Sequence, residues 1–269
     1  MIDVRDIENK IINADCIDIL KELPDKCIDL VVTSPPYDNL RTYNGTLEWS
    51  FEIFQDIAKE LARILKDGGV IVWIVADATI NGSETGTSFK QALYFKELGL
   101  NLHDTMIWSK ETFSFPNEKR YRDTFEYMFV ISKKIPNTSN LIKDRKNKWV
   151  GTKVHGTSRN PDGSIFRKCN HNKTLVNDYG VRYNIWSICS EKQNKTGHPA
   201  VFPYRLAHDH IISWSNENDI ILDCFSGSGT TAVACHNLKR RFICIEKDYD
   251  YWKASVERLK NAQAQLKLF

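Results

Sequence analysis

The stretch DCFSGSGTT, residues 223–231, decides the fold of this chain. A short apolar run over 220–222 precedes it, and residues suited to a helix follow it over 232–238. In a strand, glycine turn and helix of this order, backbone N–H groups and the positive end of the helix face a ligand. A second apolar run ends in Glu246, seventeen residues after Gly229, and this carboxylate can accept both hydroxyls of a ribose. The pattern predicts a nucleoside-binding site.

Two other interpretations of the turn stay open at this point. Residues 227–232, GSGTTA, also fit the dinucleotide pattern G-x-G-x-x-G/A of an NAD-dependent oxidoreductase, and a glycine turn can be required for packing alone. A Walker-type phosphate loop is disfavoured because no Gly-Lys-Ser/Thr follows. Only 40 residues remain after Gly229, enough for roughly one helix, one strand and a last helix over 251–263. A doubly wound sheet needs more strands, so they must precede the turn, and catalytic residues on them are expected near the N-terminus.

The bulk composition favours a cytoplasmic protein, with either one large α/β domain and an insertion or two small domains. The chain of 269 residues can bury a sizeable core, has no apolar run of about 18 residues, and carries acids among its first positions instead of a signal segment. Seven cysteines without a C-x-x-C spacing fit reduced thiols. The clusters Cys169-x-His171 and His208-Asp-His210 are better explained as surface or packing residues than as ligands, so no metal is predicted.

The net charge of +3 hides a basic segment in the middle of the chain. Between Lys133 and Lys173 there are eleven Lys or Arg residues against Asp144 and Asp162, so this window carries +9 and the rest of the chain carries −6. Such a concentration of positive charge is the usual footprint of a polyanion partner. The segment from 136 to about 183 also lacks a sustained period and is too long for a structureless connection, which predicts a functional insertion.

Apolar periodicity predicts the other elements. Strands are expected at 28–32, 70–75, 104–108 and 125–131, after a short first strand that begins at Ile11 and closes in Asp15. Helices are expected from Cys16 to Leu23 and at 51–65, 89–98 and 204–214, with Gly68 and Gly69 as the stop of the second helix.

The strand at 28–32 runs directly into Thr33-Ser34-Pro35-Pro36-Tyr37. A Pro-Pro pair after a strand can be a rigid stop and nothing more. The two prolines also remove two N–H donors, so that a hydroxyl and a proline carbonyl are left as adjacent acceptors beside the flat ring of Tyr37. In open α/β sheets ligands lie beyond the carboxyl ends of the strands, so this loop and the glycine turn are expected to face one crevice.

Two acceptors beside a stacking face suit an exocyclic aromatic amine. Hydrogen bonds to both amine hydrogens favour a pyramidal nitrogen, which frees its lone pair to attack an electrophile. S-adenosylmethionine in the nucleoside site fits that role, because its sulfonium methyl group can pass to nitrogen in one in-line displacement. No strong base is needed, since the methylated amine can lose its proton to Ser34 or to water. We also expect the backbone at Gly227 and Gly229 to approach the ligand too closely for a side chain.

The early TSPPY, the late D-x-F-x-G-x-G-T and the variable basic segment between them resemble the permuted β class of DNA amino-methyltransferases. The resemblance covers nearly the whole chain and implies an α/β, Rossmann-like S-adenosylmethionine-dependent methyltransferase fold with a mostly parallel sheet, circularly permuted, with an inserted target-recognition region. It implies that Glu246 holds the ribose, Asp15 and Cys16 meet the adenine, and His198 approaches the methionine part. The other implied cofactor residues are Asp223, Phe225, Gly227, Gly229 and Thr230, and the implied catalytic residues are Ser34, Pro35, Pro36 and Tyr37.

The resemblance also divides the chain into a catalytic half (1–135), a target-recognition insertion (136–194) and a cofactor-binding half (195–269). The expected partner is double-stranded DNA and not a membrane, and a cognate restriction endonuclease that acts separately is an open second partner. The recognised DNA word and the oligomeric state do not follow from the sequence. The residues expected to bind DNA are Arg41, Lys110, Lys143, Arg145, Lys146, Lys148 and Lys153, with a solvated surface role as the alternative for Arg41 and Lys110.

A base inside a duplex must be flipped out before it can be methylated. In enzymes of this class Ser before Pro-Pro-Tyr usually goes with the N4 amine of cytosine, and Asp or Asn with the N6 amine of adenine. Ser34 therefore favours N4-cytosine, with N6-adenine as the alternative. Three more distant alternatives are an RNA or small-molecule methyltransferase, an NAD-dependent oxidoreductase and an inactive DNA-binding module. The basic segment argues against the small molecule, and the oxidoreductase leaves residues 34–37 without a role.

Overall fold

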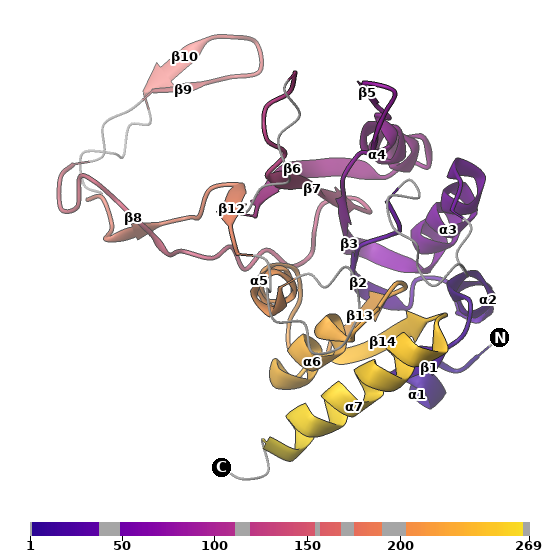
Figure 1. Ribbon diagram of the computed structural model, residues 1–269. Coiled ribbons are helices and arrows are strands. Elements are labelled where there is room, and N and C mark those ends of the chain that lie inside the picture. Colours follow the sequence, from indigo (N-terminus) through magenta and orange to yellow (C-terminus); the bar gives the residue numbers. More distant parts are fainter. Residues whose placement is uncertain are drawn as a thin grey trace. The chain divides into compact units, whose positions relative to one another are not determined.

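The computed structural model describes residues 2–37, 49–110, 119–153, 157–167, 175–189 and 203–265 (Figure 1). The chain forms two compact units. One unit comprises Met1–Asn140 and Asn184–Phe269, and the other comprises Leu141–Tyr183.

The first unit contains an eight-stranded sheet in the order β1-β14-β13-β2-β3-β7-β6-β12. Its strands are β1 (Lys10–Asn13), β2 (Ile28–Thr33), β3 (Leu65–Val75), β6 (Asn101–Ser109), β7 (Phe125–Ser132), β12 (Ile185–Ser187), β13 (Ile220–Asp223) and β14 (Arg241–Glu246). Every neighbouring pair is parallel except the two that β7 makes with β3 and β6. The predicted α/β fold with a mostly parallel sheet is confirmed.

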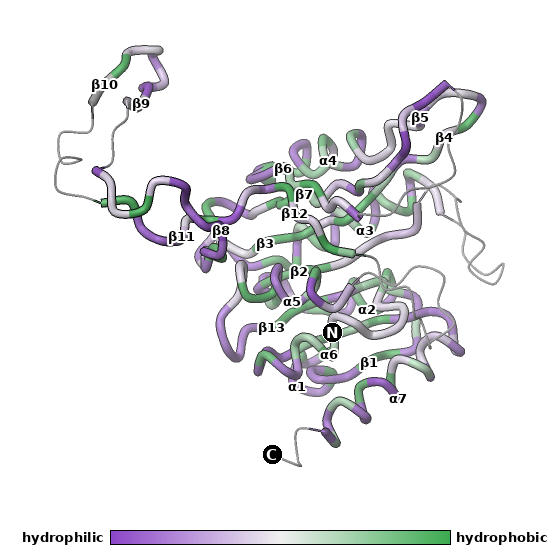
Figure 2. Tube along the Cα trace, turned by 60° about the vertical axis from the view of Figure 1, so that its left-hand side comes forward, coloured by the Kyte–Doolittle hydropathy of each residue, from purple (hydrophilic) through white to green (hydrophobic). Residues whose placement is uncertain are grey.

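Helices cover both faces of this sheet (Figure 1). On one face α2 (Cys16–Glu22), α3 (Phe51–Ile64) and α4 (Thr87–Glu97) form one apolar core with the strands, and on the other face α5 (Tyr204–Trp214), α6 (Thr230–Asn237) and α7 (Tyr249–Gln265) form a second core. Within β2, Val31 belongs to the first core and Leu30 and Val32 to the second. Both faces are therefore dry, which explains the uninterrupted apolar runs of the central strands (Figure 2).

Three small elements complete the first unit and two strand pairs form the second. The short helix α1 (Val4–Ile7) precedes β1, and β4 (Thr79–Ile80) forms a hairpin with β5 (Ser83–Glu84). In the second unit β8 (Arg145–Lys146) pairs with β11 (Tyr179–Gly180), and β9 (Thr157–Arg159) pairs with β10 (Ile165–Arg167). Strand β12 lies inside the segment expected as an insertion, yet it pairs with β6 in the main sheet.

The end of α3 differs from the expectation that two glycines stop this helix. The helix ends at Ile64, Leu65 is already extended (φ −68°, ψ 130°) and begins β3, and Gly68 and Gly69 lie within that strand. The ammonium of Lys133 donates to the carbonyls of Ala62 at 2.7 Å and Leu65 at 2.9 Å. A cation at the negative end of the helix dipole satisfies these carbonyls, so a side chain 71 positions away replaces the local glycine cap.

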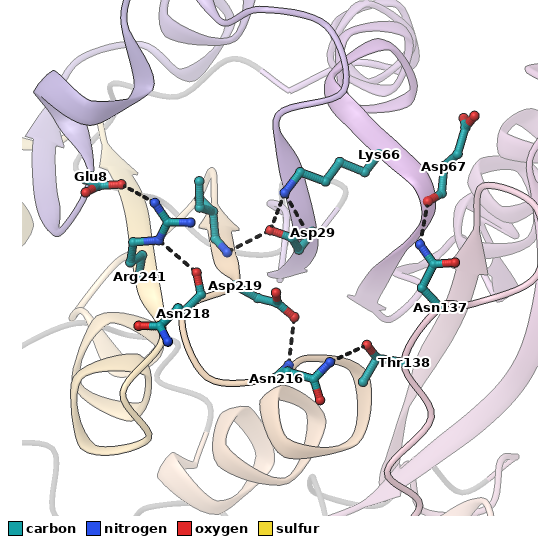
Figure 3. A network of polar contacts seen from close by, with 11 residues as sticks. Glu8, Asp29, Lys66, Asp67, Asn137, Thr138, Asn216, Asn218, Asp219 and Arg241 are labelled. Atoms are coloured by element: carbon teal, nitrogen blue, oxygen red, sulfur yellow. Dashed lines mark hydrogen bonds and ion pairs between the residues drawn. The ribbon is translucent and has the colours of Figure 1, made fainter.

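Polar contacts join the strands where they begin, at the amino edge of the sheet (Figure 3). The Asp29 carboxylate accepts from the Lys66 ammonium at 2.8 Å and from the Ile220 backbone N–H at 2.9 Å. Arg241 donates to Glu8 at 2.9 Å. The contacts of Asp29 tie β2, β3 and β13 together at this edge, and the Arg241–Glu8 pair joins β14 to the segment before β1. The carboxyl edge is left to the loops described below.

None of the helices in the described ranges has the length and apolar character needed to span a lipid bilayer. Within the same ranges no group of three or more His, Cys, Asp or Glu residues is arranged to hold a metal ion.

Candidate active site

The carboxyl ends of β13 and β2 lie side by side, with Leu222 opposite Val31 in the register. From β13 the chain passes through α6 to β14 on one side, and from β2 it passes through α3 to β3 on the other side. The strand order therefore reverses between β13 and β2, and such a switch point is where open α/β sheets bind ligands. The glycine turn and the Ser34 loop both start here, as the sequence predicts.

Asp223 joins the two loops at this point. Its carboxylate accepts from the Thr33 hydroxyl at 2.7 Å, from the Thr231 hydroxyl at 2.6 Å and from the Phe225 N–H at 3.2 Å. The side chain is completely buried, and burial raises the pKa of Asp223 to about 6. Both carboxylate oxygens face protein donors, which revises the expectation that Asp223 lines the cofactor: the side chain supports the turn from beneath.

The glycine turn is packed against α7. Gly229 has a left-handed backbone (φ +75°), and a Cβ placed there would lie 2.9 Å from the Cβ of Ser255. The packing of α7 therefore already excludes a side chain at Gly229. Close approach of a ligand, the reason expected from the sequence, is not needed to explain this glycine. Gly227 also has a positive φ of 47°.

Arg258 of α7 holds the same turn through side-chain hydrogen bonds. Its guanidinium donates to the Thr230 hydroxyl at 2.9 Å and to the Ser228 hydroxyl at 3.2 Å. Thr230 is 3% exposed, so its hydroxyl faces α7. Thr230 therefore lies in the turn as expected, although its side chain contacts the protein scaffold.

Glu246 ends β14 and reaches the glycine turn. The Gly227 N–H donates to its Oε2 at 2.7 Å, and the Asp248 N–H donates to its Oε1 at 2.9 Å. Partial burial raises the pKa of Glu246. Each carboxylate oxygen has a second lone pair, so the group keeps the capacity to accept two ribose hydroxyls.

Asp15 and Cys16 lie next to Glu246, because Asn13 of β1 pairs with Glu246 of β14. The Asp15 carboxylate caps α2 by accepting from the Ile17 N–H at 3.2 Å and forms an ion pair with Lys247 at 2.9 Å. Cys16 is buried, and burial raises the pKa of its thiol to about 12. The structure thus brings the expected adenine-side residues to the same edge as Glu246.

Phe225 makes edge-to-face contacts with Trp49 at 5.6 Å and with Trp73 at 6.5 Å between ring centroids. It remains partly exposed at the turn. His198, expected at the methionine part of the cofactor, lies outside the described residues.

The Ser34 loop is joined to strand β7 of the sheet. The hydroxyls of Ser34 and Tyr37 are 2.8 Å apart, and the Tyr37 hydroxyl donates to Glu126 at 2.7 Å. Pro35, Pro36 and Tyr37 are buried, whereas Ser34 is half-buried. Ser34 is therefore the least buried residue of the loop, and its hydroxyl can act as an acceptor.

Lys110 follows β6 and contacts the other oxygen of the Glu126 carboxylate at 2.6 Å. Its side chain is 23% exposed. The expected contact of Lys110 with a DNA phosphate is therefore not supported, because its ammonium is engaged by Glu126.

The basic residues of the second unit differ in their surroundings. Lys143, Lys146, Lys148 and Lys153 are exposed. Arg145 instead donates to the Val181 carbonyl at 3.0 Å and lies 4.7 Å from the ring centroid of Tyr183. Four of the expected DNA-binding residues thus offer their charge to solvent, Arg145 is used within the unit, and Arg41 lies outside the described residues.

Sequence reasoning missed Glu126 and Arg258. A signal for Glu126 was present, because it is a lone acid within the otherwise apolar and aromatic run 125–131. Arg258 lies on a polar helix face where many charged residues occur, and nothing local distinguishes it.

Comparison with solved structures supports the fold. The PvuII DNA methyltransferase (cytosine-N4-specific) superposes with a TM-score of 0.69 at 20% identity, covering 95% of this chain and 91% of its own. The M1.HpyAVI–SAM complex superposes with a TM-score of 0.61 at 24% identity, covering 93% of this chain and 98% of its own. At these identities the likeness concerns the fold alone.

Comparison of sequences shows the family as well as the fold. The orphan methyltransferase M.BamHII of Bacillus amyloliquefaciens is 52% identical over 249 residues, covering 90% of this chain and 92% of its own length. The DNA adenine methyltransferase YhdJ of Escherichia coli (strain K12) is 26% identical over 264 residues, covering 93% of this chain and 82% of its own. The family model N6_N4_Mtase, described as DNA methylase, matches residues 28–257. The chain therefore belongs to the N6/N4 DNA methylase family, whose methyl donor is S-adenosylmethionine.

Proposed function

We propose that this chain flips a cytosine out of duplex DNA and methylates its N4 amine. The observation that carries the proposal is the position of Ser34. The half-buried Ser34 stands at the carboxyl end of β2, beside the end of β13 from which the glycine turn begins. Acceptor and cofactor turn thus occupy one switch point of the sheet.

The cofactor residues are proposed from the contacts around the turn. Glu246 has lone pairs left for the ribose hydroxyls, Asp15 and Cys16 follow the strand paired with β14, and Phe225 lines the turn with a partly exposed ring. Asp223, Thr33 and Thr231 hold the two loops in place. His198 keeps its expected role at the methionine part as a proposal.

Methyl transfer then follows from the acceptors of the Ser34 loop. S-adenosylmethionine supplies an electrophilic methyl group on a sulfonium. The Ser34 hydroxyl and the Pro35 carbonyl accept the two hydrogens of the target amine, which favours a pyramidal nitrogen with its lone pair directed at the methyl group. Positioning supplies most of the rate in such a displacement.

The choice of cytosine rests on Ser34. A neutral, short hydroxyl is a sufficient acceptor beside a pyrimidine and leaves the ring to be placed by its neighbours. N6-adenine stays the alternative, since both amines are conjugated and present two hydrogens. Similar proteins include the DNA adenine methyltransferase YhdJ and the cytosine-N4-specific PvuII DNA methyltransferase.

The exposed lysines of the second unit are proposed to bind the DNA backbone. Lys143, Lys146, Lys148 and Lys153 concentrate positive charge on a separate compact unit. Phosphate contacts of this kind hold the duplex and position it while a base is extruded. A cognate endonuclease remains a prediction, and the related M.BamHII carries the name orphan methyltransferase.

Ser34→Ala tests the assignment of the acceptor. We expect kcat to fall by about 30- to 1000-fold, corresponding to about 2–4 kcal/mol, because one preorganised polar partner of the transition state is lost. Affinity for S-adenosylhomocysteine, measured by calorimetric titration, should be unchanged. Ser139→Ala, at an exposed serine after β7, is the matched control and should keep full activity.

Product analysis tests the base. Duplex DNA is incubated with the protein and tritiated S-adenosylmethionine and is then digested to nucleosides. The methylated nucleoside is identified by mass spectrometry. N4-methylcytosine is expected. N6-methyladenine as the sole product overturns the cytosine assignment, and no transfer to any duplex overturns the proposed activity and favours an inactive DNA-binding module.

A further inference from the structure

A chain of four polar side chains runs through the carboxyl edge of the sheet from Ser34 to Lys110. Ser34 and Tyr37 share a contact of 2.8 Å, Tyr37 donates to Glu126 Oε2 at 2.7 Å, and Lys110 contacts Glu126 Oε1 at 2.6 Å. The four residues come from three separate places: the loop after β2, the start of β7 and the residue after β6. They meet because β7 runs antiparallel, which brings its first residues to the edge where β3 and β6 end.

The direction of each hydrogen bond in this chain follows from the number of hydrogens available. A phenol has one O–H hydrogen, and that of Tyr37 points at the Glu126 carboxylate, which has none to give. At the contact with Ser34, the Tyr37 oxygen can therefore act only as the acceptor. Ser34 must donate its hydrogen to Tyr37, and the lone pairs of Ser34 Oγ are then left to accept.

The Glu126 carboxylate is held in a nearly dry place. Its side chain is 6% exposed, and its two oxygens have different partners, the Lys110 ammonium and the Tyr37 hydroxyl. A desolvated carboxylate is stable only when it is paired and hydrogen-bonded. Lys110 therefore keeps Glu126 a pure acceptor, and the acceptor state of Glu126 sets the direction of every bond up to Ser34.

We propose that Glu126 is a positioning residue that acts through Tyr37 to make the Ser34 hydroxyl an obligate hydrogen-bond acceptor for the target amine. The inference rests on the proposed function. It adds Glu126 to the site and assigns the direction of the hydrogen bond that Ser34 makes. A freely rotating serine hydroxyl can point its hydrogen at the amine and compete with the hydrogens it should accept. The hydrogen bonds from Lys110 to Ser34 exclude that orientation before the substrate arrives. Electrostatic catalysis requires this kind of preorganisation.

Glu126→Gln reverses the polarity with little change of shape. The amide oxygen of the new side chain is drawn to the Lys110 ammonium, which leaves its NH₂ to donate to the Tyr37 oxygen. The Tyr37 hydrogen is then free to donate to Ser34, and the Ser34 hydrogen turns toward the substrate. We expect kcat to fall by roughly 10- to 100-fold, with little change in KM for S-adenosylmethionine. Glu97→Gln, at an exposed glutamate that ends α4, is the matched control and should leave kcat unchanged.

A double-mutant cycle separates this role from simple structural support. Tyr37→Phe breaks the chain between Glu126 and Ser34, so Glu126→Gln should lower kcat little further when it is introduced into Tyr37→Phe. Losses that multiply in the double variant show that Glu126 does not act through Tyr37 and overturn the inference. A Glu126→Gln protein with wild-type kcat overturns it as well.

Folding is followed by thermal unfolding and by titration with S-adenosylhomocysteine. If Glu126→Gln does not fold, Tyr37→Phe alone decides: the inference requires a large loss of kcat with unchanged cofactor affinity, and wild-type turnover refutes it. Activity of the wild type on duplex DNA tests the proposed function separately. An active wild type with multiplicative losses refutes the role of Glu126 and leaves the proposed function standing.

Discussion

Gly229→Ala should destabilise the protein mainly because of α7. The backbone at Gly229 has φ +75°, and an added Cβ would lie 2.9 Å from Ser255 Cβ and 3.3 Å from Ser255 Cα. The second of these atoms belongs to the helix backbone, so the neighbour cannot move aside by a side-chain rotation.

Two separate costs contribute to the effect. An alanine in a left-handed conformation costs roughly 1–2 kcal/mol. Forcing a methyl group into a packed contact costs typically about 1–3 kcal/mol. We therefore expect the free energy of unfolding to fall by about 2–5 kcal/mol, a large part of the total stability of a domain.

Urea denaturation of matched variants measures the two costs. Gly99→Ala serves as the control, because Gly99 has φ +83° and no atom within 4 Å of an added Cβ, so it reports the backbone cost alone. Gly229→Ala/Ser255→Gly removes the side chain that the new methyl group meets first, and it should recover part of the loss once the cost of Ser255→Gly alone is subtracted. If Gly229→Ala loses no more stability than Gly99→Ala, the packing argument is refuted.

Two further predictions concern charge. Burial raises the pKa of Asp223 from 3.8 to about 6, so the native state binds this proton more tightly than the unfolded chain does. The free energy of unfolding should therefore fall by about 2 kcal/mol between pH 4 and pH 7 from this group. Asp223→Asn should lack this component in pH-dependent urea titrations, and an unchanged pH dependence contradicts it. The double variant Lys146→Glu/Lys148→Glu should weaken duplex binding and flatten its salt dependence, measured by fluorescence anisotropy, without changing cofactor affinity. The charge-matched control is the double variant Lys21→Glu/Lys260→Glu. Equal losses of duplex affinity in the two double variants argue against a DNA-binding role for Lys146 and Lys148.

Much of the fold and of the site could be predicted because the signals are local. Continuous apolar runs predict strands buried on both faces, as in β2 and β13, and the spacing of apolar residues predicts α5 over the residues that it occupies. The two motif loops follow such strands directly, and parallel strands end at one edge. The meeting of Ser34 with the glycine turn at the switch point therefore follows from local patterns together with a general rule of α/β sheets.

The partners of the site residues could not be predicted in the same way. Tyr37 contacts Glu126 at a separation of 89 positions, and Thr33 contacts Asp223 at a separation of 190. No short window contains both members of such a pair. The helix stop at Gly68 was wrong for the same reason, since the carbonyls at the end of α3 are satisfied by Lys133.

By itself the sequence determined the class of fold, the family and the two loops that carry the chemistry, because these depend on composition within a few residues. Only the tertiary structure decided which way the side chains of those loops face. Asp223 turns into the core, Thr230 turns toward Arg258, and Gly229 is required by Ser255. The physical reason is that hydrogen bonding and packing act between atoms a few ångströms apart, and the sheet order, with β7 antiparallel between β3 and β6, selects which distant residues come within that range.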